Sequence, residues 1–486
     1  MAETPQEKPV RPSRKKWWWI IPLVAVGGAL VTFGIVSLLL NIAEKKQEAS
    51  HPYFQVVELT DTTVDPAVWG QNFPIQYEAF TKTAQMPDDE KVARTPTAED
   101  PREFTALSKL EADPRLVTMW QGYAFSVDYR EPRGHAYTLI DQLYTRRMLE
   151  FKQPGACINC HASTVVLMNN LGNGDTMAGW ATMNKTPYKE LATNPDAQHP
   201  VACIDCHEPQ TMKLRVTRPA FIEGIKEYKA SVGVADFDPN KDASPNEMRT
   251  YVCAQCHVEY YFKGEEKTLT FPWEKGLTVD DALAYYDEVG WSDFTHKLTG
   301  ANVVKAQHPD FETWSNGVHA RAGVTCADCH MPYKRVGASK VSDHWVRSPM
   351  KDNVNASCLT CHHETEAEMK ERVQVIHDRY DHAKNISFDA LDQLITDIEA
   401  AQKNGVATDL LDSARTHQRK AQFFLDYVVS ENSRGFHAPA YTIRILNDVT
   451  DESRRGQLAL LGHEMPASST STPATPSATP SATPSR

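Results

Sequence analysis

The chain has 486 residues, enough for two or three ordinary domains, and carries a formal net charge of −12. A negative charge of this size argues against nucleic acid as a partner, because the phosphate backbone would repel it. Apolar residues make up 41% of the chain and the alternation typical of strands is scarce, which predicts a mainly α fold with little β-structure.

The first element along the chain is an uncharged run from Trp17 to Leu40, which exceeds the about 20 residues that a helix needs to cross a bilayer. Basic residues are more frequent before this run than after it, so the positive-inside rule places the N-terminus in the cytoplasm. We predict a cytoplasmic basic segment over residues 1–16, a transmembrane anchor over residues 17–42 and a body on the extracytoplasmic face, periplasmic or outer. A cleaved signal peptide is the alternative, but its apolar core is usually only about 7–15 residues long.

Residues 43–364 contain all ten cysteines, and these fall without exception into five C-x-x-C-H boxes. In such a box two thiols attach covalently to haem and the histidine ligates the iron. Zinc ribbons, disulfide frameworks and redox-active C-x-x-C motifs do not require that histidine, so five repeats argue against them. The boxes predict five covalently bound haem c groups, held by Cys157, Cys160 and His161; Cys203, Cys206 and His207; Cys253, Cys256 and His257; Cys326, Cys329 and His330; and Cys358, Cys361 and His362.

Outside the boxes this pentahaem region shows little regular pattern. Residues 51–153 are rich in Pro, Asp, Thr and aromatic residues, which indicates irregular structure with short helices. Porphyrins would supply apolar surface that side chains usually provide. The predicted fold is therefore a multihaem cytochrome c body of mainly α class, with an N-terminal transmembrane helix.

Residues 365–465 follow a different pattern, that of long amphipathic helices. Thr365 and Glu368 form a capping box that begins the first helix, and Ser387 is expected to cap a second that ends at residues 404–405. A third is expected from about Asp409 to Asn432. Their apolar stripes either pack only on the haem core or also form a subunit interface, which would make the protein a homodimer. Residues 466–486 are Ser, Thr, Pro and Ala repeats, which predict a disordered tail.

Five haems need ten axial ligands, of which the boxes supply five. Thirteen of the eighteen histidines lie outside the boxes, so counting alone does not decide whether every iron has two imidazole ligands. The distinction is functional, because an iron with two protein ligands only passes electrons, whereas an open iron can bind and reduce a small molecule.

Together with the five boxes, three strings carry a resemblance to a known family: Cys-Ala-Gln-Cys-His-Val-Glu-Tyr-Tyr-Phe at residues 253–262, Lys-Ala-Gln-His-Pro at residues 305–309 and Trp-Gly-Gln-Asn-Phe-Pro at residues 69–74. Between about residues 64 and 437 the chain resembles the ammonia-forming cytochrome c nitrite reductases. The resemblance implies a six-electron reduction of nitrite to ammonium at the haem of the first box, with His161 as proximal ligand where most relatives have lysine. It also implies a distal catalytic triad of Arg147, Tyr260 and His308.

The same resemblance implies the remaining ligands. Four haems would each have two histidine ligands, paired as His135 with His257, His344 with His207, His437 with His330, and His319 with His362. One calcium ion would be held by oxygen donors, which suit this hard cation, from the Glu259 side chain, the Tyr260 and Lys305 carbonyls and the Gln307 amide. A quinol-oxidising cytochrome in the membrane would supply the electrons.

Two other interpretations stay open at this point. The chain could be a non-enzymatic electron conduit in which all five irons have two histidine ligands, or a related reductase that acts mainly on hydroxylamine, sulfite or nitric oxide. Arg147 could also pair with a haem propionate or lie in solvent, and the adjacent Arg146 offers a second candidate for the cation.

Overall fold

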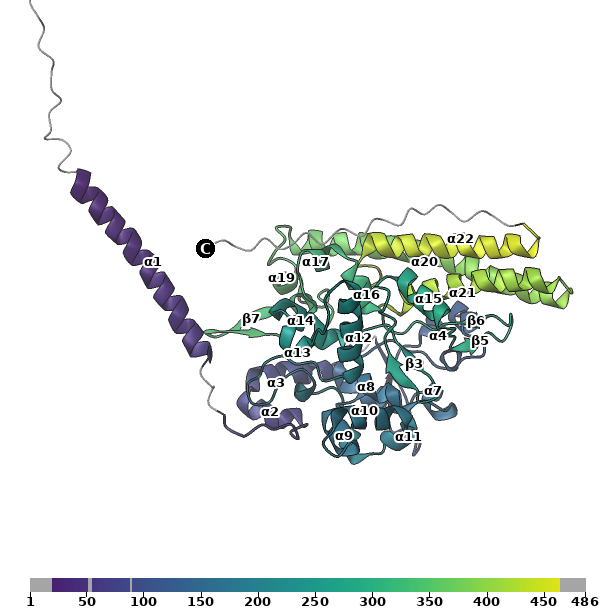
Figure 1. Cartoon of the computed structure of the whole chain (residues 1–486), viewed down its shortest axis with the longest axis horizontal. Coiled ribbons are helices and arrows are strands. Elements are labelled where there is room, and N and C mark those ends of the chain that lie inside the picture. The colour runs from purple at the N-terminus through teal and green to yellow at the C-terminus, as the bar shows by residue number, and fades with distance from the viewer. Residues whose placement is uncertain (1–19, 51–54, 88–89, 464–486) are drawn as a thin grey trace, which may run out of the picture. The chain divides into compact units, whose positions relative to one another are not determined.

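The computed structural model describes residues 20–50, 55–87 and 90–463, and these residues are mainly helical (Figure 1). The prediction of a mainly α fold with little β-structure is confirmed. The chain divides into two compact units, Met1–Glu58 and Leu59–Arg486. The strands described form two-stranded antiparallel hairpins: β1 (Lys91–Ala93) with β2 (Phe104–Ala106), β3 (Tyr261–Lys263) with β4 (Thr268–Thr270), β5 (Phe294–Thr295) with β6 (Asn302–Val303), and β7 (Tyr333–Val336) with β8 (Ser339–Ser342).

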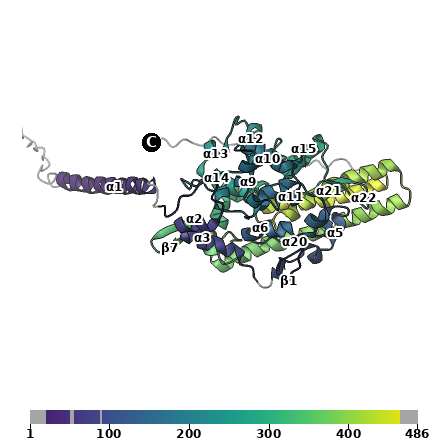
Figure 2. The ribbon, with the colours of Figure 1, turned by 90° about the horizontal axis from the view of Figure 1, so that it is seen from below.

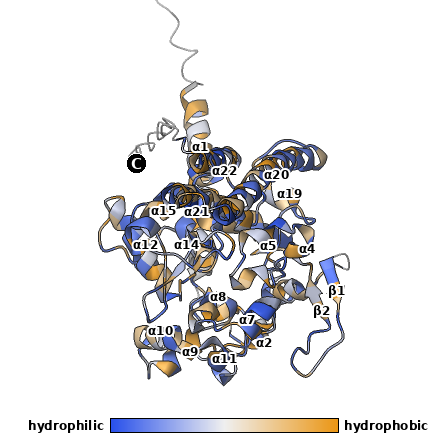
Figure 3. Cartoon of the chain, turned by 90° about the vertical axis from the view of Figure 1, so that its right-hand side faces the viewer, coloured by the Kyte–Doolittle hydropathy of each residue, from blue (hydrophilic) through white to orange (hydrophobic). Residues whose placement is uncertain are grey.

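The first unit contains the helix α1 (Ile20–Ser50), and its segment Ile21–Leu40 is long and apolar enough to cross a membrane. No other helix in the described ranges meets this criterion. Apolar side chains such as Leu23 and Phe33 are exposed on α1, which Figure 3 colours largely as apolar. A membrane anchor and a signal sequence both have this character. Residues 1–16, the first three residues of the predicted anchor and the tail 466–486 lie outside the described residues.

The second unit begins with short helices that are started by local caps. The Asp65 carboxylate accepts a hydrogen bond from the Ala67 N–H at the start of α2, and Pro66 occupies the first helical position. The helices of the first half are α2 (Pro66–Asn72), α3 (Pro74–Thr81), α4 (Lys109–Ala112), α5 (Arg115–Met119), α6 (Thr138–Leu143), α7 (Arg146–Glu150), α8 (Ile158–His161), α9 (Val165–Leu171), α10 (Thr176–Lys185) and α11 (Tyr188–Leu191).

Short helices continue through the remaining boxes. Ser244 and Glu247 form a capping box at the start of α14, which leads into the third box. The helices of this part are α12 (Pro219–Ser231), α13 (Pro239–Asp242), α14 (Pro245–Ala254), α15 (Val279–Glu288), α16 (Asp310–Ser315), α17 (Val318–Arg321), α18 (Cys326–His330) and α19 (Val354–Ser357).

Three long helices complete the unit: α20 (Glu366–Lys403), α21 (Thr408–Ser430) and α22 (Pro439–Leu460). They lie side by side, with α22 packed along both α20 and α21 (Figure 2). The predicted capping box of Thr365 and Glu368 is confirmed, because the side chain of each residue accepts a hydrogen bond from the backbone N–H of the other. The helix α22 was not among the helices bounded from the sequence.

The predicted cap at Ser387 is wrong, because α20 runs through this position without a break. The Ser387 hydroxyl lies 2.9 Å from the Ala383 carbonyl oxygen of the preceding turn and 2.7 Å from the Leu446 carbonyl oxygen of α22. A serine that bonds back within a helix satisfies its hydroxyl without ending the helix. The two helices expected before residue 404 are therefore one.

The apolar stripes of these helices are buried within the single chain. Leu391 of α20, Phe423 of α21 and Leu446 of α22 are at most 1% exposed and share a core with Trp120 and Tyr286 from the haem region. Packing on the body accounts for these stripes. The homodimer stays a prediction.

Candidate active site and haem-binding centres

Each C-x-x-C-H box lies on a helical turn or at a helix end. The first spans the 3-10 turn Gly155–Cys157 and α8, the second begins with the 3-10 turn Cys203–Asp205, the third ends α14, the fourth is α18 and the fifth follows α19. One helical turn brings both cysteines and the histidine to one face, because positions i, i+3 and i+4 are neighbours. None of the ten cysteines forms a disulfide, so all remain free to attach haem.

Three of the boxes lie against one another in a row. The Cys256 thiol of the third box lowers the pKa of Cys160 in the first box. The Cys326 thiol of the fourth box raises the pKa of Cys253 in the third. The third box is thus in contact with both the first and the fourth.

The second and fifth boxes join this row at different places. The pKa of Cys206 in the second box is raised well above its usual range, mainly by burial and further by nearby groups that include Cys253 of the third box. Burial and then Cys358 of the fifth box raise the pKa of Cys329 in the fourth box to about 12. The spatial order is therefore first, third, fourth and fifth, with the second box beside the third.

Four box histidines face a second histidine. Two imidazoles that bind one metal ion from opposite sides, with bonds of about 2 Å, have ring centres about 6 Å apart. The ring centres lie 6.1–6.4 Å apart in His135 and His257, His207 and His344, His319 and His362, and His330 and His437. The structure therefore brings together every histidine pair that the resemblance implied, at a spacing suited to one iron.

The remaining box histidine, His161, makes no ring contact with another aromatic residue in the described part of the chain. Its Nδ1 donates to the Thr138 carbonyl oxygen at 3.0 Å, which leaves Nε2 for a metal. Burial, with a smaller contribution from Arg147, lowers the pKa of His161 to about 4. The imidazole is therefore neutral at pH 7, as a metal ligand must be.

The predicted distal residues gather around the first box. Burial raises the pKa of Cys157 to about 12, and the nearby Arg147 opposes this shift. Burial, and then the thiols of the first box, raise the pKa of Tyr260 well above its usual range. Burial, with a smaller contribution from His161, lowers the pKa of His308 to about 3. Arg147, Tyr260 and His308 thus all interact electrostatically with the first box.

The polar atoms of two of these side chains are available to a ligand. Neither the Tyr260 hydroxyl nor the His308 ring hydrogen-bonds to another residue in the ranges that the structure describes, and both side chains are half-buried. The raised pKa keeps the Tyr260 phenol protonated at pH 7, and the lowered pKa keeps the His308 imidazole neutral. Both groups can donate a hydrogen bond.

Arg147 keeps its positive charge uncompensated. Its Nη1 donates to the Asp128 carbonyl oxygen at 3.1 Å and its Nη2 to the Gln142 amide oxygen at 2.9 Å, and both acceptors are neutral. No described carboxylate forms an ion pair with it, whereas Arg146 pairs with Glu150 at 2.7 Å and is exposed. Of the two adjacent arginines, Arg147 is the one suited to bind an anion.

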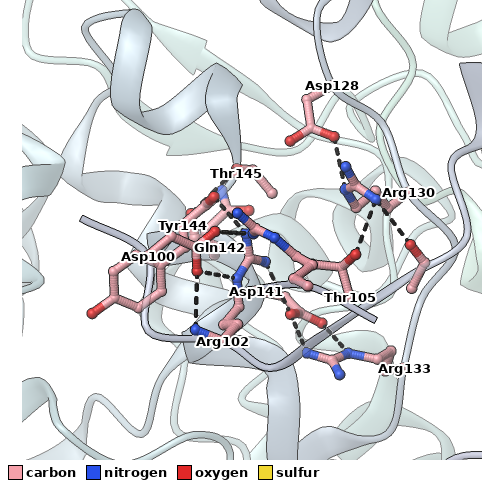
Figure 4. Close-up of polar contacts among 12 residues, drawn as sticks. Asp100, Arg102, Thr105, Asp128, Arg130, Arg133, Asp141, Gln142, Tyr144 and Thr145 are labelled. Carbon is pink, nitrogen blue, oxygen red and sulfur yellow. Dashed lines mark hydrogen bonds and ion pairs between the residues drawn. The ribbon is translucent and has the colours of Figure 1, made fainter. Parts of the chain in front are cut away.

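Ion pairs hold the segment before Arg147 in place (Figure 4). Arg102 donates to both carboxylate oxygens of Asp100, at 2.9 and 2.8 Å, and to the Tyr144 carbonyl oxygen at 2.7 Å. Arg133 donates to Asp141 at 2.6 Å. Because Asp141 lies in α6 and Tyr144 directly follows this helix, these contacts fix α6 in place.

The predicted calcium ligands surround a buried carboxylate. Glu259 is 0% exposed and accepts hydrogen bonds from the Gln307 N–H at 2.6 Å and the Tyr286 hydroxyl at 2.9 Å. Burial raises its pKa well above the usual range, and no described cationic side chain forms an ion pair with it. The Lys305 ammonium pairs with Asp426 instead, at 3.0 Å. A buried carboxylate without a cationic partner is one that a metal ion would stabilise.

The other predicted calcium donors lie beside Glu259. The Gln307 amide nitrogen donates to the Lys305 carbonyl oxygen at 3.2 Å, so these two groups already meet. Rotation of the amide by half a turn would present its oxygen in place of the nitrogen. Tyr260 follows Glu259 in the chain. The residues present therefore fit a calcium ion.

Arg218, which connects the first and second boxes, was not among the residues predicted from the sequence. Arg218 is 0% exposed, pairs with Asp205 of the second box at 2.8 Å, and donates to the Asn159 and Ala162 carbonyl oxygens of the first at 2.6 and 3.0 Å. Asp205 stands inside its C-x-x-C-H box, which was the one available signal that a cation lies nearby.

Two carboxylates beside axial histidines were also missed. Asp310, Glu431 and His437 lie close enough together to hold a metal ion. However, the Asp310 carboxylate lies 3.1 Å from His257 Nδ1, and Glu431 lies 2.6 Å from His437 Nδ1. Carboxylates in this position orient histidine ligands and increase their basicity. The cluster is therefore better explained by support of two histidines that the family resemblance assigns to haem iron.

A helical body with neighbouring haem-attachment boxes and histidine pairs spaced to bind one iron each defines a multihaem c-type cytochrome. The model of the cytochrome c552 family matches residues 65–485, and the chain belongs to this family. Cytochromes c-552 of Bacteroides fragilis and Parabacteroides distasonis are 37% and 34% identical to it, and the alignments cover 90% and 92% of this chain and 85% and 86% of theirs.

A solved structure extends the comparison to the fold. The cytochrome c nitrite reductase of Desulfovibrio desulfuricans, described as having two calcium sites in its catalytic subunit, superposes with a TM-score of 0.71 at 29% identity. The match covers 84% of this chain and 88% of that one. The family resemblance found in the sequence is confirmed.

Proposed function

We propose that the protein is an ammonia-forming cytochrome c nitrite reductase whose reaction takes place at the first box. One observation carries the proposal. Among the five box histidines, only His161 lacks a facing imidazole in the described chain, and its surroundings contain Arg147, a cation without an ion pair. The solved relative is itself named a nitrite reductase, which supports nitrite as the substrate.

The residues around the first box match the needs of this reaction. Haem held by Cys157, Cys160 and His161 would supply an iron able to bind nitrite and pass electrons to it. Arg147 attracts the anion and stabilises negative charge on its oxygens. His308 and Tyr260 donate hydrogen bonds and protons to those oxygens, so that each leaves as water. An anion in the pocket favours protonation of His308, whose pKa burial otherwise lowers to about 3.

The other four boxes are proposed to relay the six electrons that reduction of nitrite to ammonium consumes. The four histidine pairs, at 6.1–6.4 Å, are spaced to close both faces of an iron, which suits electron transfer without substrate binding. The contacts between successive boxes support one continuous path. Five haem c groups are proposed in all.

One calcium ion is proposed at Glu259, with the Tyr260 and Lys305 carbonyls and the Gln307 amide oxygen. There it would neutralise the buried carboxylate and hold the segment of Tyr260 in register with that of His308, which follows Gln307. Metal analysis of the purified protein tests this proposal. Calcium should be present at about one ion per chain; a fully active calcium-free protein would contradict it.

The location and partners are proposals as well. The apolar helix α1 is compatible with a single-pass membrane anchor that holds the body on the extracytoplasmic face, where a quinol-oxidising cytochrome would donate electrons. The protein is proposed to be a homodimer through its long C-terminal helices, which size measurement in detergent would test.

The catalytic proposal is tested with the purified holoprotein, nitrite and a reduced viologen, with ammonium as the measured product. Electron paramagnetic resonance of the oxidised protein should show one high-spin haem among low-spin haems. An entirely low-spin spectrum without ammonium production would favour the electron conduit. Faster turnover of hydroxylamine, sulfite or nitric oxide than of nitrite would favour the related reductases.

A further inference from the structure

The short helix α6 contacts the first box through two different groups. At its first residue, the Thr138 carbonyl oxygen accepts from His161 Nδ1 at 3.0 Å. One turn later, the Gln142 amide oxygen accepts from Arg147 Nη2 at 2.9 Å. We propose that Gln142 is a positioning residue that directs Arg147 to the anion without cancelling its charge. This inference rests on the proposed function.

Gln142 is itself held in one orientation. Its side chain is buried, and its amide nitrogen lies 3.3 Å from the Met148 sulfur, so the oxygen is left to face Arg147. The ion pair of Asp141 with Arg133 fixes the same helix (Figure 4). A group fixed in this way can position the guanidinium before substrate arrives, which is the condition for precise binding.

The neutrality of Gln142 distinguishes its arginine from those nearby. The surrounding arginines pair with carboxylates: Arg102 with Asp100, Arg130 with Asp128, Arg133 with Asp141, and Arg146 with Glu150. Among the described residues, the Arg147 guanidinium donates to the neutral oxygens of the Gln142 amide and the Asp128 carbonyl and forms no ion pair, and it lies over the Phe125 ring at 4.8 Å. An amide oxygen accepts the same hydrogen bond as a carboxylate but leaves the full positive charge for an anion.

Substitution of Gln142 by Glu separates this role from simple support. The carboxylate has nearly the shape of the amide and can still accept from Arg147, so a structural role alone predicts little change. Charge compensation predicts instead that Gln142→Glu weakens nitrite binding by about tenfold or more. The measurement is the dissociation constant of nitrite, from the absorption spectrum of the oxidised holoprotein, together with kcat and KM.

The matched control is Gln402→Glu. The Gln402 amide oxygen also accepts from an arginine, Arg415 Nη2, at 2.7 Å, but lies between α20 and α21. This variant should bind nitrite like the unchanged protein. A Gln142→Glu protein that does so too, with normal haem content, would overturn the inference.

Two further variants keep the test decisive. Gln142→Ala removes the acceptor for Arg147 but leaves the positive charge of Arg147, so kcat should fall about tenfold while the dissociation constant of nitrite changes less. An unchanged kcat would overturn the positioning role even if the Glu variant does not fold. Arg147→Ala should abolish tight nitrite binding. If it binds nitrite normally, the proposed pocket fails, whereas if it loses binding and Gln142→Glu does not, only the role of Gln142 fails.

Discussion

The first and third haem-attachment boxes share one five-residue pattern and lie against each other, yet their surroundings differ. His257 of the third box faces His135 and is supported by the Asp310 carboxylate. His161 of the first box has no facing imidazole among the described residues and is supported by the Thr138 carbonyl. The pattern itself determines where haem attaches. The groups on the opposite face determine whether the iron can meet a substrate.

The largest effect is expected from removal of Arg147, the arginine near the first box that forms no ion pair in the described chain. Arg147→Ala should lower ammonium production from nitrite by about 100-fold to 1,000-fold, because a fixed charge at the reacting anion is lost. Haem content and the absorption spectrum should stay unchanged. Arg146→Ala is the matched control, since Arg146 is exposed and already paired with Glu150. Equal rates in the two variants would show that the pocket is misplaced.

A second change should make the third box resemble the first. His135→Ala removes the imidazole that faces His257, so electron paramagnetic resonance should show an additional high-spin haem. The charged groups that affect the pKa of His135 are His257 and Asp205, with no arginine among them, so we expect this face to add no nitrite turnover of its own. An unchanged low-spin spectrum would mean that His135 does not ligate this iron.

The third prediction concerns the residue that links the first box to the second. Arg218→Ala should lower the free energy of unfolding by about 3–5 kcal/mol, because the buried Asp205 carboxylate loses its partner. Arg372→Ala is the control: it pairs with Glu364 at 2.8 Å with both side chains exposed, and a surface pair contributes at most about 1 kcal/mol. The comparison is made by the midpoint of thermal unfolding of the two holoproteins. Similar midpoints would contradict the structural role of Arg218.

The smallest effect is expected at Asp100, which through Arg102 helps to fix α6 beside the first box. Although burial opposes it, the contacts with Arg102 and Arg94 lower the pKa of Asp100 in the folded protein. Its stabilisation is therefore complete above the unfolded pKa of about 4 and is lost as the pH falls below it. Asp100→Asn should cost about 2 kcal/mol at pH 7, and the difference should shrink in acid. A difference in unfolding midpoint that is independent of pH would disprove this linkage.

The features predicted from the sequence were those encoded locally. The five boxes, the capping box at Thr365 and the long C-terminal helices follow from spacing and periodicity over a few residues. The histidine partners were obtained only through the family resemblance, because His135 and His257 are far apart in the chain. Ser387 was mistaken for a cap because its hydroxyl is satisfied by Leu446, a contact that no local pattern reveals.

The residues that distinguish one box from another were hardest to predict for the same reason. Asp310, Arg218 and Gln142 act through neighbours that folding brings to them, and each is an ordinary residue in its own segment. The charge of Arg147 could be read from the sequence. Its lack of a carboxylate partner could not, because that depends on every segment packed around it.

Cysteines of the third box lie beside cysteines of the first, second and fourth boxes, and Arg218 joins the first box to the second. With haem bound at every box as proposed, the third box would be the place where electron paths from the second and fourth boxes meet before they reach the first. A donor that delivers single electrons could then reduce the haems of both paths one at a time. The reaction site would receive electrons from haems that are already reduced, without waiting for each transfer from the donor.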